Sequence, residues 1–138
     1  MPDNPMPDSP AKTALVTGAS SGIGQATALQ LAELGYTVYA GARRVERMSD
    51  LADRGIRTTA VDLTDDASMV ALVAEIIDDT GRIDVLVNNA GYGLYGALED
   101  VPIEEARRQF EVNVFGLARL TQLVLPQMRA QRDGYIVN

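Results

Sequence analysis

"TGASSGIG", residues 17–24, is the stretch of sequence that decides the fold. It follows a β-favouring run at 13–16 and precedes helically spaced apolar residues that end at Gly35. Its glycines let the backbone turn sharply and approach a ligand closely, and the N–H groups that open the helix would suit an anion such as a pyrophosphate. The spacing is Gly-x-x-x-Gly-x-Gly rather than Gly-x-Gly-x-x-Gly, so a purely structural turn stays open as an alternative for this stretch alone.

Strands and helices alternate along the rest of the chain. Strands are predicted at 36–42, 57–63, 83–87 and 135–137, and helices at 45–55, 64–81 and 103–131, with Pro126 expected to kink or locally break the last helix. This alternation implies an α/β fold, a Rossmann-like doubly wound parallel sheet that is truncated after its fifth strand. We expect a flexible Pro/Asp-rich tail at 1–11 and one dinucleotide-binding Rossmann domain at 12–138, incomplete at its C-terminus.

The composition narrows the possible partners. The 19 acidic and 12 basic residues give a net charge of -7, which argues against nucleic acid as a partner. Neither cysteine nor histidine is present, so thiolate and imidazole ligands are excluded and no metal site is expected. No run approaches about 18 consecutive apolar residues, and no signal peptide opens the chain, so we expect no membrane partner and a cytoplasmic location.

The fourth predicted strand leads into a second candidate wall for a ligand. In a doubly wound sheet, ligands bind at the carboxyl ends of strands where the strand order reverses, which here falls between the first strand and the fourth. Asn88 and Asn89 could present side-chain amides there, and Gly91 would let the chain turn away. Taken alone, the tetrapeptide "NNAG" is more typical of an ordinary turn than of a ligand site.

The ends of the second and third predicted strands carry charged candidates. Arg43 and Arg44 stand where such folds bind the adenosine ribose, and either guanidinium could clamp a 2′-phosphate. Asp62 is placed to accept a hydrogen bond from an adenine amino group. A solvated arginine pair and a surface aspartate that caps the next helix are the alternatives.

Four motifs in this order, "TGASSGIG", "VDL", "NNAG" and "VNVFG", resemble the landmarks of the short-chain dehydrogenase/reductase family over residues 12–138. The resemblance implies cofactor contacts from Gly18, Ser20, Ser21, Gly22, Ile23 and Gly24 at the pyrophosphate, from Asp62 with Leu63 beside it, and from Asn89, Ala90 and Gly91 near the nicotinamide ribose. It also implies that Asn113, within "VNVFG", is a catalytic residue that helps to hold a water in the proton relay behind a lysine.

The same resemblance implies a preference for NADP over NAD. Ala42 occupies the position that is acidic in many NAD users, and Arg43 the next position, which is often basic in NADP users. One residue departs from the pattern, because many NADP users carry a basic residue where this chain has Ser21.

The catalytic motif of the family is absent from the printed residues. Members transfer a hydride between a nicotinamide and a carbonyl or alcohol, using a tyrosine, a lysine four residues later, and a serine. The only lysine is Lys12, which precedes every tyrosine. We therefore expect the catalytic serine, tyrosine and lysine to lie beyond the printed chain, and the fragment alone to be inactive.

The resemblance thus implies an NADP(H)-dependent oxidoreductase that acts on a small carbonyl or alcohol substrate. The apolar helical stretch that contains Phe110 and Phe115 would need a partner surface, so a homo-oligomer is expected. Two alternatives stay open from the residues: a non-catalytic nucleotide-binding or regulatory module, and another Rossmann-like enzyme such as a methyltransferase.

Overall fold

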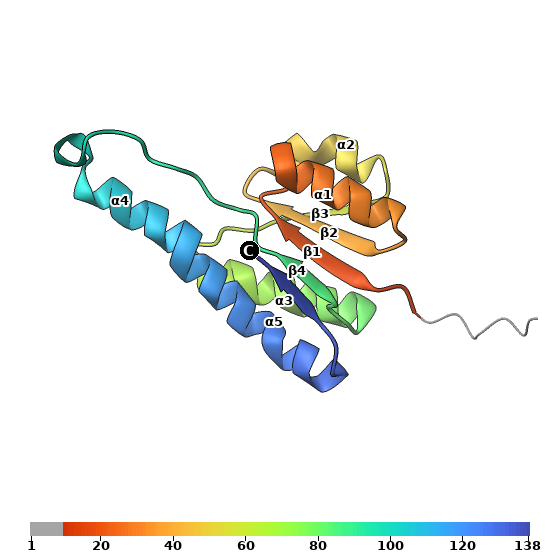
Figure 1. Cartoon of the computed structure of the whole chain (residues 1–138). Helices are drawn as coiled ribbons and strands as arrows, with labels where there is room; N and C mark the ends of the chain where they lie inside the picture. The colour runs from red at the N-terminus through yellow and green to blue at the C-terminus, as the bar shows by residue number, and fades with distance from the viewer. Residues whose placement is uncertain (1–9) are drawn as a thin grey trace, which may run out of the picture.

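The core of the molecule is a five-stranded parallel sheet with helices on both faces (Figure 1). A computed structural model describes residues 10–138, so the predicted tail at 1–11 lies almost wholly outside the described residues. The strand order is β3-β2-β1-β4-β5, with bounds β1 Thr13–Thr17, β2 Thr37–Ala42, β3 Arg57–Ala60, β4 Val85–Val87 and β5 Tyr135–Val137. The order reverses between β1 and β4, as predicted, and the Rossmann-like doubly wound sheet is confirmed.

Alternating side chains of the central strands form one core on each face of the sheet. All of β1 is buried; Leu15 packs against α3 (Asp66–Thr80) and α5 (Leu117–Gln131), whereas Val16 packs on the opposite face, in the cluster that contains residues of α1 (Gly22–Glu33) and α2 (Ser49–Ala52). The continuous apolar run of β1 is what a parallel strand covered on both sides requires. Figure 1 shows α1 and α2 on one side of the sheet and α3 and α5 on the other.

Both ends of α3 have local capping residues, whereas the amino end of α1 has no side-chain cap. The carboxylate of Asp65 accepts a hydrogen bond from the backbone N–H of Ala67 at the start of α3, and Gly81 ends that helix at φ 70°. Ser21 precedes α1 without a side-chain cap, and the first turn of α1 holds no acidic residue. Within residues 10–138, no helix is long and apolar enough to cross a bilayer.

Several elements differ from the sequence predictions. The fourth strand starts at Val85 rather than at residue 83, and the helix predicted at 45–55 is a 3-10 helix, Val45–Met48, followed by α2. The third strand ends at Ala60 rather than at residue 63, because the chain leaves the sheet to form the loop before α3. The predicted break at Pro126 is wrong, since α5 continues through this exposed residue; the irregularity lies instead at Glu111–Gly116, a π-helical segment between α4 (Ile103–Phe110) and α5. A π segment admits an extra residue into a helix and is frequent at functional sites.

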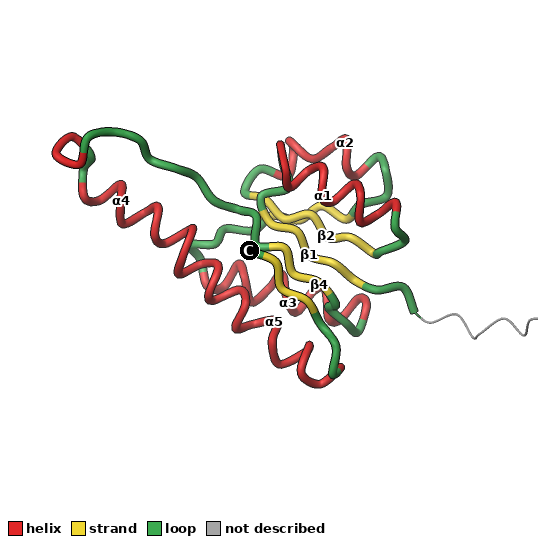
Figure 2. The backbone as a smooth tube through the Cα atoms, viewed as in Figure 1, coloured by secondary structure: helices red, strands yellow, loops and turns green. Residues whose placement is uncertain are grey.

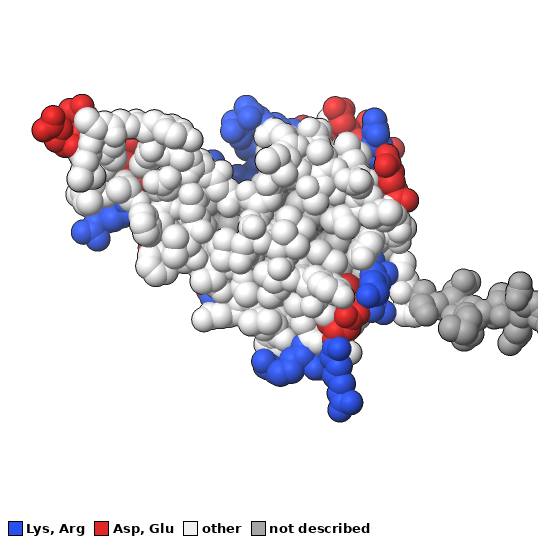
Figure 3. Space-filling model, in the orientation of Figure 1, with Lys and Arg blue, Asp and Glu red and all other residues white. Residues whose placement is uncertain are grey.

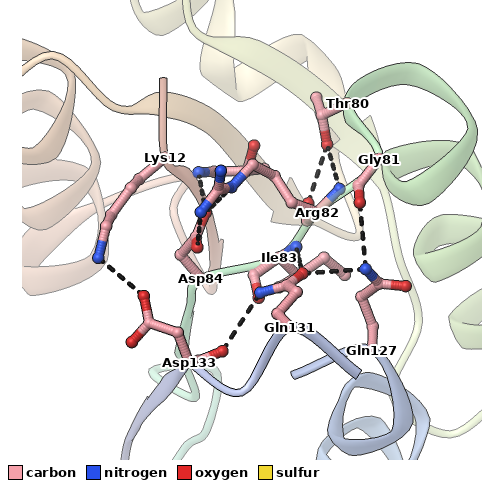
Figure 4. A network of polar contacts seen from close by, with 10 residues as sticks. Lys12, Thr80, Gly81, Arg82, Ile83, Asp84, Gln127, Gln131 and Asp133 are labelled. Carbon is pink, nitrogen blue, oxygen red and sulfur yellow. Dashed lines mark hydrogen bonds and ion pairs between the residues drawn. The ribbon is translucent and has the colours of Figure 1, made fainter. Parts of the chain in front are cut away.

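A polar network joins the amino ends of β1, β4 and β5 (Figure 4). The buried carboxylate of Asp84 accepts two hydrogen bonds from Arg82, at 2.6 and 2.7 Å, and one from the Thr13 N–H at 2.7 Å. Beside it, Lys12 forms an ion pair of 2.9 Å with Asp133. These bonds set the register of three strands at the edge opposite the candidate site.

Candidate cofactor-binding site

The loops after β1 and β4 lie side by side at the carboxyl edge of the sheet (Figure 2). The side-chain amide of Asn89 donates to the carbonyl oxygens of Thr17 and Gly18, both at 3.1 Å, and the Ala90 N–H donates to Thr17 Oγ1 at 3.1 Å. Gly18 has φ 64°, and a Cβ atom on it would lie 2.8 Å from the Ala90 Cα. Glycine is therefore required at position 18 both by conformation and by space.

A cavity of about 250 Å³ lies at this edge, between the glycine turn, the ends of β2 and β3, and the loop after β4. The residues that line it and that the sequence predicted are Gly18, Ser20, Ser21, Arg43, Asp62, Leu63, Ala90 and Gly91. The structure thus brings together residues from all four predicted stretches. The remaining lining residues are Gly41, Ala42, Val61, Tyr92 and Val112.

The amino end of α1 gives the glycine turn an electropositive character. With no side-chain cap and no acidic residue in its first turn, the helix leaves its opening N–H groups and the positive end of its dipole available to an anion. Ser20 and Ser21, which immediately precede this helix, line the cavity and can donate hydroxyl hydrogen bonds. This combination of donors suits a phosphate group.

The cavity lining contains one cation, Arg43, and one anion, Asp62. Arg43 is exposed, and its charge is one of the influences that lower the pKa of Asp62. The larger causes are the hydrogen bonds that Asp62 Oδ1 accepts from the Thr64 N–H at 2.9 Å and the Thr64 hydroxyl at 2.7 Å. Asp62 is therefore a carboxylate at neutral pH and can act only as a hydrogen-bond acceptor.

The π segment supports two walls of the cavity. Asn113 Oδ1 accepts from the Tyr92 N–H at 3.1 Å, and Asn113 Nδ2 donates to the Tyr92 carbonyl oxygen at 2.8 Å. At the end of the same segment, Gly116 lies so close to the Leu63 carbonyl oxygen that a Cβ atom would overlap it. One irregular helical segment therefore contacts both the loop after β3 and the loop after β4.

Several predicted residues lie beside the cavity rather than in its lining: Gly22, Ile23, Gly24, Arg44, Asn89 and Asn113. The amides of Asn89 and Asn113 bond to backbone groups of the cavity walls, and Asn88 Nδ2 donates to Thr121 Oγ1 and Asn138 Oδ1. Among the described residues, Asn88 Oδ1 is buried without a hydrogen-bond partner. Ile23 and Arg44 are exposed.

Four lining residues were missed by the sequence reasoning. Gly41 and Val61 stand at the carboxyl ends of the second and third strands, a position that would have identified them. Tyr92 directly follows Gly91, so it too had a signal. Val112 belongs to the motif "VNVFG" and precedes Asn113, so it had a signal as well, although only the packing of the π segment against the sheet brings it to the cavity.

Comparisons with known proteins agree with this geometry. A family model described as short chain dehydrogenase matches residues 12–138. The chain is 43% identical over 124 residues to a 3-ketodihydrosphingosine reductase of Bacteroides thetaiotaomicron, covering 90% of this chain and 45% of that protein. The chain spans about half the length of the curated relatives it matches.

Solved structures show the same fold. A short-chain dehydrogenase from Streptomyces avermitilis superposes with a TM-score of 0.90 at 44% identity, over 93% of this chain and 48% of that one. A metagenomic short-chain oxidoreductase in complex with NADP gives 0.84 at 35% identity, over 91% and 60% of the two chains. An NAD+-bound xylitol dehydrogenase also gives 0.84, at 34% identity, over 92% and 52%.

Proposed function

The chain belongs to the short-chain dehydrogenase/reductase family, and we propose that these residues form the cofactor-binding part of an NADP(H)-dependent oxidoreductase. Hydride transfer would connect the nicotinamide with a small carbonyl or alcohol substrate. Membership of this family excludes the alternative that the chain is a methyltransferase, which the sequence had left open.

The observation that carries this proposal is the cavity itself. It places an uncapped helix start, two serine hydroxyls, a carboxylate and an arginine along one continuous surface at the point where the strand order reverses. A dinucleotide needs such a series: donors for the pyrophosphate, an acceptor for the adenine amino group and, for NADP, a cation for the 2′-phosphate. The residues present therefore fit a nicotinamide dinucleotide.

Each residue then has a proposed task. Gly18, Ser20 and Ser21 would hold the pyrophosphate, with the opening N–H groups of α1 at Gly22, Ile23 and Gly24. Asp62, beside Leu63, would accept from the adenine amino group. Ala90 and Gly91 would border the nicotinamide ribose, while Asn89 positions the glycine turn through its two carbonyl contacts.

The proposed preference for NADP rests on Arg43. Its exposed guanidinium borders the cavity, and no acidic residue occupies the end of β2 to receive ribose hydroxyl groups. Arg44 is exposed next to it and could contribute to the same phosphate. The structural relatives include both an NADP complex and an NAD+ complex, so the choice depends on this chain's own residues.

The bound cofactor would supply the hydride to a carbonyl or accept it from an alcohol, while the residues of this chain bind and orient the cofactor. The 138 residues hold no tyrosine with a lysine four positions later, so the proton-transfer groups would have to come from elsewhere. Asn113 keeps its proposed place in a proton relay, although its side chain is occupied by the Tyr92 backbone. This division of tasks predicts cofactor binding without turnover by these residues alone.

The second candidate function is a non-catalytic nucleotide-binding or regulatory module, which the same cavity would serve equally well. Titration of the purified chain with NADPH and NADH, followed by calorimetry, tests the shared part of both proposals. Tighter binding of NADPH is expected, and failure to bind either cofactor would contradict both. Turnover of a carbonyl or alcohol panel by the protein expressed from the complete gene then separates the enzyme from the module.

A further inference from the structure

The carbonyl oxygen of Tyr92 accepts hydrogen bonds from two side-chain amides. Asn113 Nδ2 donates to it at 2.8 Å, and Gln109 Nε2 donates to it at 2.9 Å. A carbonyl oxygen has two lone pairs, so these contacts satisfy it fully. Since Asn113 Oδ1 also receives the Tyr92 N–H, both polar groups of this residue's backbone are held by one helical segment.

The two amides act from one side of that segment. Gln109 belongs to α4 and Asn113 to the π segment, and residues four apart lie on the same face of a helix. Ile103, Phe110 and Phe115 surround a separate hollow on this helical segment, and neither Gln109 nor Asn113 lines it. No sequence motif contains Gln109, and its role becomes visible only when the loop after β4 is placed against α4.

The segment that this contact holds needs an external support. Residues 91–97 contain Gly91, Gly93 and Gly96 and form neither helix nor strand. Glycine-rich backbone loses much conformational entropy when it is ordered. Gly91 and Tyr92 nevertheless line the cavity proposed to bind the cofactor. The conformation of this cavity wall therefore depends on the hydrogen bonds that fix the Tyr92 backbone.

We propose that Gln109 is a positioning residue, which holds the Gly91–Tyr92 wall in the conformation that binds the nicotinamide cofactor. The inference rests on the proposed function, because its consequence is an effect on cofactor affinity. If only a fraction of molecules has the wall in place, the apparent dissociation constant rises by the inverse of that fraction. Gln109 acts through Tyr92 and touches neither the cofactor nor the reacting atoms.

Variants at position 109 separate hydrogen-bond donation from side-chain size. Gln109→Glu keeps the shape but turns a carboxylate toward the Tyr92 carbonyl, Gln109→Leu removes all polarity, and Gln109→Lys restores a donor. The dissociation constant for NADPH is expected to rise about three- to tenfold in the first two variants, the range of one net hydrogen bond, and to recover in the third. The Tm should change little, because Asn113 still holds the loop.

The matched controls are Gln122→Glu and Gln122→Lys, at an exposed position of α5 outside the cavity lining. They measure how a change of net charge alone affects NADPH binding. If the variants at 109 and 122 shift the dissociation constant equally, Gln109 has no positioning role. A fall in Tm that parallels the loss of affinity at position 109 would also overturn the proposal, since it would indicate a structural role.

A fluorescent reporter at position 92 measures the solvent exposure of the Gly91–Tyr92 wall in the absence of cofactor. The chain contains no tryptophan, so Tyr92→Trp introduces a single tryptophan, which can be excited selectively over the remaining tyrosines, at the half-exposed residue whose backbone Gln109 holds. In that background Gln109→Glu should increase quenching by acrylamide, and Gln109→Lys should not; unchanged quenching in both overturns the proposal. The two proposals can fail separately. If the unmodified chain binds neither NADPH nor NADH, the proposed function is wrong, and so is the proposed effect of Gln109 on cofactor affinity. If the unmodified chain binds NADPH and every variant binds it with the same affinity, only the proposed role of Gln109 is wrong.

Discussion

Gly24 lies directly against the side chain of Asn89: a Cβ atom at Gly24 would overlap Asn89 Nδ2 and the carbonyl oxygen of Gly18. The same Asn89 amide donates to the carbonyls of Thr17 and Gly18. The third glycine of "TGASSGIG" is therefore required by the close packing of α1 against the glycine turn, and Gly24 does not line the cavity. Within this turn, the residues that line the cavity are Gly18, Ser20 and Ser21.

Replacing Gly24 with alanine should destabilise the protein although alanine favours helices. The added methyl group must displace both the Asn89 amide and the Gly18 backbone, and overpacking of this kind costs about 1–3 kcal/mol. Urea unfolding measures the loss. Combining Gly24→Ala with Asn89→Ala should not restore stability, because the Gly18 carbonyl would still be overlapped; full recovery in the double variant would show that only the side chain matters.

Arg43→Ala should weaken binding of NADPH and leave binding of NADH nearly unchanged. A charge-assisted contact with the 2′-phosphate would account for about a ten- to hundredfold change in affinity. The control is Arg54→Ala, which removes another exposed arginine that does not line the cavity. Calorimetric titration of the unmodified chain and of both variants with NADPH and NADH gives the six dissociation constants. A parallel loss of NADPH and NADH affinity would contradict a phosphate-specific role.

Asp84 should contribute to stability in a pH-dependent way. Burial by itself would raise the pKa of Asp84, but the hydrogen bonds from Arg82 and from the Thr13 N–H outweigh it, and the pKa lies below its ordinary value. A lowered pKa means that this stabilisation is present above about pH 4, the unfolded-state value, and is lost as the pH falls through the folded-state value.

Asp84→Asn should therefore lower the free energy of unfolding by about 3 kcal/mol at pH 7, because it leaves the partly buried Arg82 without its charge partner. The difference from the unmodified protein should narrow below about pH 4. Asp133→Asn is the control, since its ion pair with Lys12 is exposed and therefore contributes little to stability. Urea unfolding at several pH values measures both variants. An equal loss of unfolding free energy in Asp84→Asn and Asp133→Asn would contradict the role proposed for Asp84.

The outer face of α4 and the π segment should mediate self-association. Phe110 and Phe115 are 56% and 59% exposed and border a hollow of about 400 Å³ together with Ile103 and Ala106. In Figure 3 the charged side chains gather at the margins of the face shown, which leaves much of it uncharged. Large apolar side chains that gather around an exposed hollow commonly mark an interface, and Arg107 and Glu111 add charge to the lining of this one.

Phe110→Ser together with Phe115→Ser should shift sedimentation velocity toward monomer. Leu34→Ser, at an isolated exposed position after α1, should leave the distribution unchanged. A single monomeric species for the unmodified chain across a wide concentration range would rule out association through this face.

The architecture could be predicted because its determinants are local. A continuous apolar run predicts a buried parallel strand, helical spacing at 69–77 predicts α3, and the Asp65 and Gly81 caps mark its ends. Strand boundaries and the π segment could not be predicted, because they depend on where loops leave the sheet and on how closely Gly116 approaches the Leu63 backbone.

By itself, the sequence determined the order of elements, the reversal of strand order, and the gathering of the glycine turn, Arg43 and Asp62 at one edge of the sheet, since parallel strands all end there. Only the tertiary structure decided which groups the side-chain amides of Asn89, Gln109 and Asn113 bond to. Asn89 bonds to backbone 72 residues away, and Gln109 and Asn113 bond to Tyr92 across a loop. An amide can serve a ligand or a backbone equally well, and the choice is made by the groups that folding brings within hydrogen-bonding distance.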